Sequence, residues 1–211
     1  VARLTRTLAI LGYVRYDEPT ARYRLTVSML CLANPVLAHL AIRRIARPLM
    51  QQLADYAHGA VSIGARQGPD IVLVESCIDN NSINARPDIG ALRSIGDTAL
   101  GLAWLAAQDD KTRKSVVADL AAAGRIEPKA FRPILDAELA SFRKNGFCVS
   151  RDRARRGMHA VAVPIRNTDG EVLVFNCSVA AFQLAPRSLE ADLGPRLVNL
   201  AQSVEMALGR G

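Results

Sequence analysis

The chain has 211 residues, of which 50% are hydrophobic and 22% charged, so it can form one large domain or two small ones around a buried core. Its composition excludes a disordered or fibrous protein, and no unbroken apolar run approaches the roughly 20 residues that cross a bilayer. No signal peptide opens the chain, so we expect a cytoplasmic protein without a membrane partner.

The formal net charge of +7 is concentrated near the N-terminus. Residues 1–48 carry eight arginines against two acids, a net of +6, whereas the remainder carries 19 basic and 18 acidic residues. This asymmetry is typical of a nucleic-acid-binding segment joined to a nearly neutral body. A solvated arginine-rich surface without a nucleic-acid partner would carry the same charge.

The first 25 residues have the pattern of a helix followed by a hairpin. Leu4, Leu8 and Leu11 recur at helical spacing, and Gly12 can end the helix by adopting positive φ. Two short extended runs, 13–16 and 22–25, flank a turn-prone stretch. This order is typical of the recognition helix and wing of a winged helix-turn-helix. Because an amphipathic helix cannot bury its apolar face alone, we expect a partner helix upstream or from another chain.

Residues 26–59 are helical in pattern, and prolines are expected to divide them. Pro35 should interrupt the pattern, and Pro48 stands where a new helix can begin. We therefore predict three parts, namely the C-terminal part of a winged helix-turn-helix over 1–25, a linker helix region over 26–47 and a further domain over 48–211.

The pattern beyond residue 59 predicts an α+β domain. Predicted strands occupy residues 60–66, 71–77, 147–150, 159–165 and 171–179. Predicted helices occupy residues 97–107, 109–123, 128–145 and 186–208. Residues 79–95 have no clean period and read as a loop. Because the strands fall into hairpins and the helices gather before and after them, we expect an antiparallel sheet flanked by helices.

The cysteines and histidines do not suggest a metal site. No two of the four cysteines form a C-x-x-C pair, and each lies in an apolar stretch, so we interpret them as buried reduced thiols: Cys31, Cys77, Cys148 and Cys177. The three histidines have no second ligand at metal spacing. We therefore expect neither a metal nor a cofactor.

Several motifs, in this order along the chain, resemble those of the IclR family of bacterial regulators. Residues 1–14 look like the end of that family's recognition helix and its first wing strand, and residues 23–25 look like the second. Asp97-Thr98-Ala99-Leu100-Gly101 resembles the threonine-alanine-x-glycine start of a helix in its sensor domain. Five further stretches resemble the strands on the ligand-binding side of the family's sensor domain, namely residues 146–147, 157, 162–165, 169–170 and 175–178. The resemblance covers nearly the whole chain and implies that residues 48–211 form a GAF-like, effector-binding sensor domain.

One departure affects the loop before the sensor helix. The family usually has a proline, a hydrophobic residue and a histidine there, whereas this chain has Ser94-Ile95-Gly96.

The N-terminal residues suggest contacts with double-stranded operator DNA. Arg3 and Arg6 lie beside the apolar stripe of their helix, where guanidinium groups can reach phosphates or guanine edges, and Thr7 can contact a base or a phosphate. On the wing, Arg22 and Arg24 flank Tyr23, an arrangement suited to backbone contact. The alternative is a solvated basic face on a structural helix.

The resemblance also implies a small organic acid effector, bound between the loop before the sensor helix and the ends of the later strands. The matching positions are Ile95, Ser150, Ala160, Asn176 and Ser178. Asn176 and Ser178 are two residues apart on a strand, so they project to one face and can donate together to a carboxylate, although local sheet hydrogen bonding would use the same groups. His159 can add positive charge. By resemblance to members that regulate aromatic-acid catabolism, the effector is a hydroxybenzoate-like or dicarboxylic acid.

We predict a ligand-responsive transcription factor rather than an enzyme. Ser150, Asp152 and His159 form the only nearby serine–acid–histidine set, and neither a G-x-S-x-G elbow nor a phosphate-binding glycine loop accompanies them. The alternative is a sensor domain that signals through protein contacts without binding DNA. Because dimers set the spacing of DNA half-sites, we expect self-association, and the resemblance implies dimers that pair into tetramers.

Overall fold

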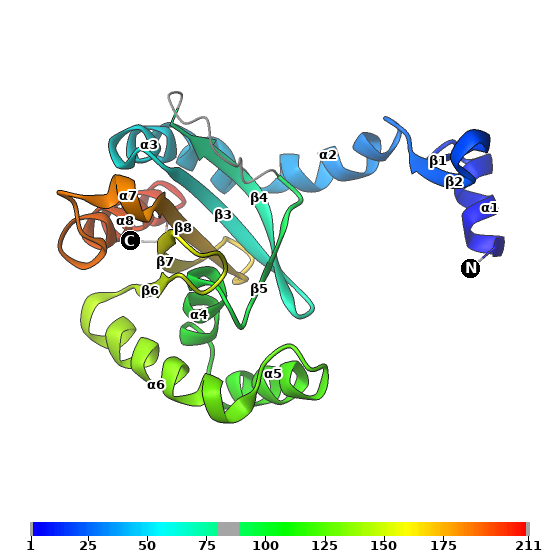
Figure 1. Cartoon of the computed structure of the whole chain (residues 1–211). Coiled ribbons are helices and arrows are strands. Elements are labelled where there is room, and N and C mark those ends of the chain that lie inside the picture. Colours follow the sequence, from blue (N-terminus) through cyan, green and yellow to red (C-terminus); the bar gives the residue numbers. More distant parts are fainter. Residues whose placement is uncertain (1, 80–88, 210–211) are drawn as a thin grey trace. The chain divides into compact units, whose positions relative to one another are not determined.

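The computed structural model describes residues 2–79 and 89–209 (Figure 1). The chain separates into two compact units, an N-terminal unit, Val1–Ala41, and a C-terminal unit, Ile42–Gly211. In the described residues no single helix is long and apolar enough to span a membrane, and only α2 and α3 taken together, across the break between them, have the required length and composition.

The N-terminal unit confirms the predicted helix, capping glycine and hairpin. Helix α1 (Ala2–Ile10) ends at Gly12, whose φ is +75°. Strands β1 (Val14–Asp17) and β2 (Arg22–Leu25) pair antiparallel around a single 3-10 turn, η1 (Glu18–Thr20). Helix α2 (Met29–His39) follows.

The helix boundaries near the two prolines differ from the prediction. Pro35 lies inside α2 and Pro48 inside α3 (Ala41–Ala57), and the break between these helices falls at Leu40. A proline within a helix costs about 3 kcal/mol, so other interactions must offset it. In α3 that offset is burial, because one face of the helix lies in the core along its whole length: Ile42, Ala46, Met50, Leu53, Ala54 and Ala57.

The C-terminal unit is built on a six-stranded antiparallel sheet in the order β5-β4-β3-β8-β7-β6. The strands are β3 (Ala60–Gln67), β4 (Asp70–Ile78), β5 (Leu92–Ser94), β6 (Cys148–Arg151), β7 (Met158–Arg166) and β8 (Val172–Ala180). Five of them match the predicted strands. The sixth, β5, lies in the stretch 79–95 that was expected to be a loop, part of which is outside the described residues.

Helices cover both faces of this sheet (Figure 1). Helices α4 (Ala99–Ala106), α5 (Asp110–Ala122) and α6 (Pro128–Asn145) share a hydrophobic core with side chains of one face, such as Ala162 and Val174. Helices α3 and α8 (Gly194–Ala207) lie on the other face. The chain between β8 and α8 contains α7 (Ala181–Leu184) and a wide π-helical turn, Leu189–Leu193. The prediction of a single helix over 186–208 is therefore wrong for its first residues. Pro195 has no backbone N–H with which to continue the π-helical turn, and it lies instead in the first turn of α8.

Three of the four cysteines are buried, as expected. Burial raises the pKa of the Cys77 and Cys148 thiols and raises that of Cys177 to about 12. Cys31 is exposed on α2, so its interpretation as a buried thiol is wrong for the described structure. The reason is that no residue of α2 is buried in the described structure.

Candidate functional site

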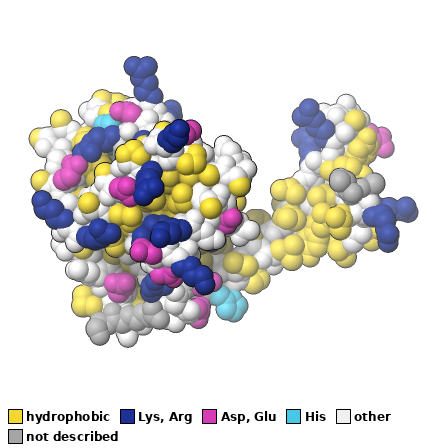
Figure 2. All heavy atoms as spheres, turned by 90° about the horizontal axis from the view of Figure 1, so that it is seen from below, with side chains coloured by type: hydrophobic (Ala, Val, Ile, Leu, Met, Phe, Trp, Pro, Cys, Tyr) yellow, Lys and Arg dark blue, Asp and Glu magenta, His cyan; other side chains and the backbone are white. Residues whose placement is uncertain are grey.

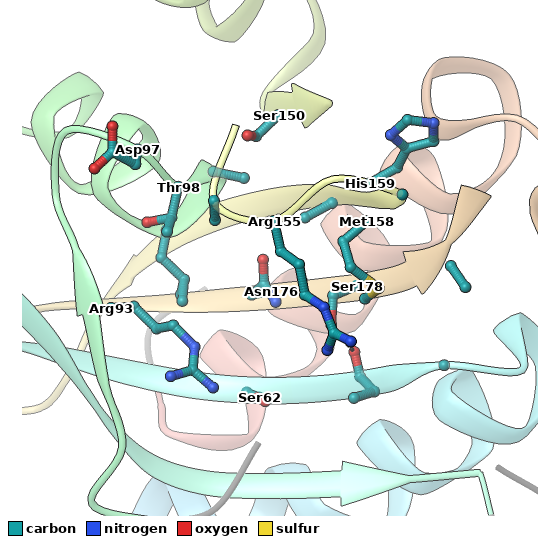
Figure 3. Close-up of a pocket in the computed structure, with 18 of the residues that line it drawn as sticks. Ser62, Arg93, Asp97, Thr98, Ser150, Arg155, Met158, His159, Asn176 and Ser178 are labelled. Atoms are coloured by element: carbon teal, nitrogen blue, oxygen red, sulfur yellow. Dashed lines mark hydrogen bonds between the residues drawn. The ribbon is translucent and has the colours of Figure 1, made fainter. Parts of the chain in front are cut away.

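A cavity of about 780 Å³ lies against the face of the sheet that packs on α4 (Figure 3). Its walls come from β3, β7 and β8, from the segment β5–α4 and from the loop 152–157 between β6 and β7. Leu73, Leu100 and Met158 give it apolar surface. Its size is within the range of about 300–1,000 Å³ that is typical of small-molecule sites.

The polar floor of the cavity follows from the register of the strands. Directly opposite residues of antiparallel strands share a face of the sheet. Ser62 lies opposite Asn176, and Ser178 lies opposite Ala160, which in turn lies opposite Ser150. All five line the cavity. The sheet therefore brings together four of the sequence-predicted ligand residues, and Ser62 is an addition that the sequence pattern did not single out.

The amide of Asn176 is the best-placed ligand group on this floor. Asn176 is only 8% exposed, and its side chain makes no hydrogen bond to the part of the chain that the structure describes. Ser178 donates a long hydrogen bond of 3.5 Å to the carbonyl of Ala60, and Ser62 shares one of 3.1 Å with Ser76. Local sheet hydrogen bonding thus occupies the serines but not the amide, which is therefore available to a ligand in the cavity.

The other two predicted ligand residues differ in their positions. Ile95 does not line the cavity, since its side chain is fully buried in the core around α4. His159 does line the cavity, but the register places it opposite Val179 and Arg151, on the other face of the sheet from Ser178. Its ring points away from the cavity (Figure 3). Chain position alone does not show which face a strand residue occupies.

Three arginines line the cavity that the sequence analysis did not propose as ligands. Arg93 comes from β5, and Arg155 and Arg156 come from the loop 152–157. None forms an ion pair with any residue in 2–79 or 89–209. Asp97 is the acidic residue of the lining, and its carboxylate points away from Arg93 and Arg155 (Figure 3). The cavity therefore has an excess of positive charge and suits an anion.

The two loops that border the cavity are tied together. Arg153 donates from Nη2 to the carbonyl of Gly96, 2.7 Å away, which joins the loop 152–157 to the segment before α4. Within the loop, the Asp152 carboxylate accepts from the backbone N–H of Gly157 at 2.6 Å. These contacts hold Arg155 and Arg156 over the cavity.

Strand β4 separates the cavity from helix α3. Its Leu73 and Ile78 line the cavity, whereas Glu75 faces α3 and is almost fully buried. The Glu75 carboxylate accepts from Nε of Arg43 at 3.1 Å and from Nη1 of Arg47 at 2.9 Å. A displacement of β4 by a ligand would therefore act directly on α3, the helix that follows the N-terminal unit in the chain.

The hairpin of the N-terminal unit has one basic and one aromatic face. Arg22 and Arg24 share a face with Arg15, which lies opposite Arg24. Tyr23 lies on the other face, with its ring centroid 5.1 Å from that of Tyr16. Arg15 is thus a basic residue that sequence reasoning missed, although the strand alternation contains the signal. Arg24 also forms an ion pair with Asp17, at 2.9 Å.

Helix α1 exposes both its basic and its apolar residues. Arg3, Arg6 and Thr7 are exposed, and the Thr7 hydroxyl donates to the carbonyl of Arg3 at 3.0 Å. Leu4 and Leu11 of the predicted apolar stripe are also exposed, and hydrophobic side chains cover much of the surface of this unit in Figure 2.

Comparison with known sequences decides the family. The family model described as "Bacterial transcriptional regulator IclR C-terminal" matches residues 34–205. The chain belongs to the IclR family. The regulator TsaQ1/TsaQ2 of Comamonas testosteroni is 27% identical over 208 residues, which are 97% of this chain and 75% of that protein. The Pca regulon regulatory protein of Pseudomonas putida is 28% identical over 207 residues, or 94% of this chain and 68% of that protein.

Solved structures of IclR-family proteins confirm the predicted α+β fold. An IclR family transcriptional regulator from Brucella abortus is 35% identical and superposes with a TM-score of 0.88 over 98% of this chain and 78% of that one. The IclR protein of Thermotoga maritima is 22% identical, with a TM-score of 0.72 over 98% of this chain and 84% of that one, and supports the fold alone. The C-terminal unit is thus the GAF-like domain of a transcription regulator.

These IclR-family relatives are transcriptional regulators rather than enzymes. The serine–acid–histidine set considered from the sequence is not assembled, because Ser150 faces the cavity while His159 lies on the opposite face of the sheet. The Asp152 carboxylate is engaged by the backbone of its own loop.

The threonine of the IclR helix-start motif has a capping role that can be measured. The Thr98 hydroxyl accepts from the N–H of Gly101 at 3.1 Å and donates to the carbonyl of Ser94 at 2.7 Å. We expect Thr98→Ala to lower the free energy of unfolding by about 1–2 kcal/mol, because both hydrogen bonds are lost. Urea titration followed by circular dichroism measures this. Thr98→Ser keeps the hydroxyl and should lose less than half as much; equal losses would show that the methyl group, not the cap, matters.

Proposed function

We propose that this chain is a DNA-binding transcriptional regulator whose operator affinity is controlled by a small organic acid bound in the cavity of the C-terminal unit. The observation that carries the proposal is the amide of Asn176, which has no hydrogen bond to the described residues and lies on the floor of a cavity lined by three arginines. A carboxylate would accept a hydrogen bond from this amide. Its negative charge would also pair with the positively charged arginines. The apolar walls suit a hydrocarbon or aromatic body, so an aromatic acid remains part of the proposal.

We propose that effector binding affects the DNA-binding part through the linker region. Residues 1–25 belong to the DNA-binding part, residues 26–47 to the linker region, and residues 48–211 sense the effector. The pair of hydrogen bonds from Arg43 and Arg47 to Glu75 attaches the linker end of α3 to the cavity strand β4. Coupling between two such sites is typically about 1–3 kcal/mol, which changes operator affinity about 5–150-fold.

The basic residues of the N-terminal unit are the proposed DNA contacts. They comprise Arg3, Arg6 and Thr7 on α1 and Arg22, Tyr23 and Arg24 on the hairpin, to which the shared face adds Arg15. Each phosphate contact would steepen the salt dependence of binding, with a slope of about −0.9 per contact. We further propose that the protein acts in the cytoplasm as a dimer or tetramer, since paired heads are needed to read two half-sites.

The effector site is tested by thermal titration of the chain with a panel of small organic and aromatic acids. An acid at about 100 times its dissociation constant adds about 2.7 kcal/mol of stability, which raises the melting temperature of a chain of this size by about 5–10 °C. We expect Asn176→Ala to remove that shift. Asn199→Ala, at an exposed asparagine of α8, is the matched control and should keep it. A shift that survives in Asn176→Ala would show that the ligand binds elsewhere.

The DNA-binding part has a separate test, because a sensor that signals only through protein contacts would have the same cavity. With the first helices of the winged helix-turn-helix supplied upstream of residues 1–25, selection of bound fragments from a random duplex pool should enrich a sequence with two half-sites. If binding shows no sequence preference at any salt concentration, the alternative without operator binding is the correct one.

A further inference from the structure

We propose that the cavity selects an acid with two negative charges over a monoanion of the same size, through Arg93 and Arg155. This inference rests on the proposed function and specifies the class of its effector. Its starting point is the charge of the lining, in which the described residues supply three guanidinium groups and one carboxylate. The described lining also contains two histidines, His58, which contacts Asp79 at 3.1 Å, and His159.

The positions of the two arginines support a doubly charged ligand. Arg93 comes from the edge strand β5 and Arg155 from the loop 152–157, so they enter the cavity from different walls. Their guanidinium groups lie on either side of the Asn176 amide (Figure 3). Arg93 donates one N–H to the carbonyl of Leu92, and the guanidinium of Arg155 makes no hydrogen bond within the described residues, although its backbone carbonyl accepts from Met158. Most donors of both groups are therefore available.

One carboxylate is satisfied by one bidentate guanidinium. A second guanidinium and an amide would then be left to water, and a second anionic group would add a charge-assisted contact to them. Two ligand chemistries meet this requirement, namely a dicarboxylate, with one carboxylate for each arginine, and a phosphate monoester, whose single head group carries both charges. In both cases the apolar surface of Leu73, Leu100 and Met158 would face the carbon skeleton.

The test compares each dianion with the monoanion that differs only by a methyl ester, in the full chain, by calorimetric titration at pH 7.5 and fixed ionic strength. The pairs are adipate and its monomethyl ester, terephthalate and its monomethyl ester, and phenyl phosphate and phenyl methyl phosphate. We expect the dianion of at least one pair to bind at least about tenfold more tightly, since Arg155 is exposed and water screens part of its attraction. The pair that shows the difference identifies the dicarboxylate or the phosphate chemistry.

Variants assign the preference to the two arginines. Arg93→Gln and Arg155→Gln should each reduce the dianion-to-monoanion ratio to below about threefold, whereas Arg132→Gln, at an exposed arginine of α6, should leave it unchanged. Equal binding of dianions and monoanions, or a ratio that survives both variants, overturns the dianion inference while the proposed effector site stands. If no acid of either charge binds, the effector site and the dianion inference both fail.

Discussion

Replacement of Glu75 by alanine should lower the free energy of unfolding of the C-terminal unit by about 2–4 kcal/mol. The Glu75 side chain is 3% exposed and binds two arginines of α3, at 3.0 Å from Nη2 of Arg43 and 2.9 Å from Nη1 of Arg47. Its loss removes charge-assisted hydrogen bonds and leaves the Arg43 guanidinium, which is 22% exposed, without its buried anion. Arg47 is 61% exposed, so water can solvate it in the variant. The free energy of unfolding therefore falls less than it would if both arginines were buried.

Urea titration followed by the fluorescence of Trp104 measures this loss. Trp104 is the single tryptophan and lies in α4, so its signal reports on the C-terminal unit. The matched control is Asp136→Ala, which removes an exposed ion pair with Arg132 at 3.9 Å and should change stability by less than about 0.5 kcal/mol. Equal effects of the two variants would mean that the Glu75 pair is as weak as a surface pair.

Glu75→Gln separates charge from shape. Glutamine fills the same space and keeps one oxygen acceptor for the arginines, so we expect a loss between those of wild type and alanine. If the attachment of α3 to β4 also transmits the effector signal, Glu75→Gln should reduce the effect of ligand on operator affinity without reducing the affinity for the ligand itself. This second measurement distinguishes a role in coupling from a role in stability alone.

The elements that sequence predicted well are those set by local rules. Alternating side chains and a glycine-containing turn defined the hairpin of β7 and β8, and the same alternation placed Asn176 and Ser178 on one face. The predicted ranges of α4, α5 and α6 also agree with the structure, where Thr98 and Asp109 cap the first two helices and Gly146 ends the third with positive φ.

Sequence failed where the answer depends on contacts between distant segments. Pro48 was expected to begin a helix, but burial along α3 keeps the helix intact on both sides of it. His159 is a different case, because strand alternation alone places it on the opposite face of the sheet from its neighbour Ala160. Arg93 and Arg155 are 62 positions apart and line the same cavity only because β5 joins one edge of the sheet while the loop after β6 folds over the cavity. Without the strand order, neither arginine carries a signal that it belongs to the site.

Gly101→Ala should destabilise the C-terminal unit by about 2–3 kcal/mol, although the same change stabilises an ordinary helix interior by about 0.5–1 kcal/mol. Gly101 is in the first turn of α4, where an added Cβ would lie 2.1 Å from the carbonyl oxygen of Ile95 and 2.2 Å from its Cα. These are backbone atoms of a fully buried residue, so they cannot move aside as a flexible side chain would. This contact explains why the helix-start motif requires glycine three residues after its capping threonine.

Ligand binding provides a second measurement for Gly101→Ala. Relief of the clash must push the segment before α4 outward, and Ser94, Asp97 and Thr98 of that segment line the cavity. Gly101→Ala should therefore weaken binding of any acid that the cavity accepts, in addition to lowering stability in urea. Ala130→Gly, on the exposed side of α6, controls for helix propensity and should cost about 1 kcal/mol without changing binding. A Gly101→Ala protein that is more stable than wild type would show that α4 can shift freely against Ile95, and that helix propensity rather than this backbone contact governs the position.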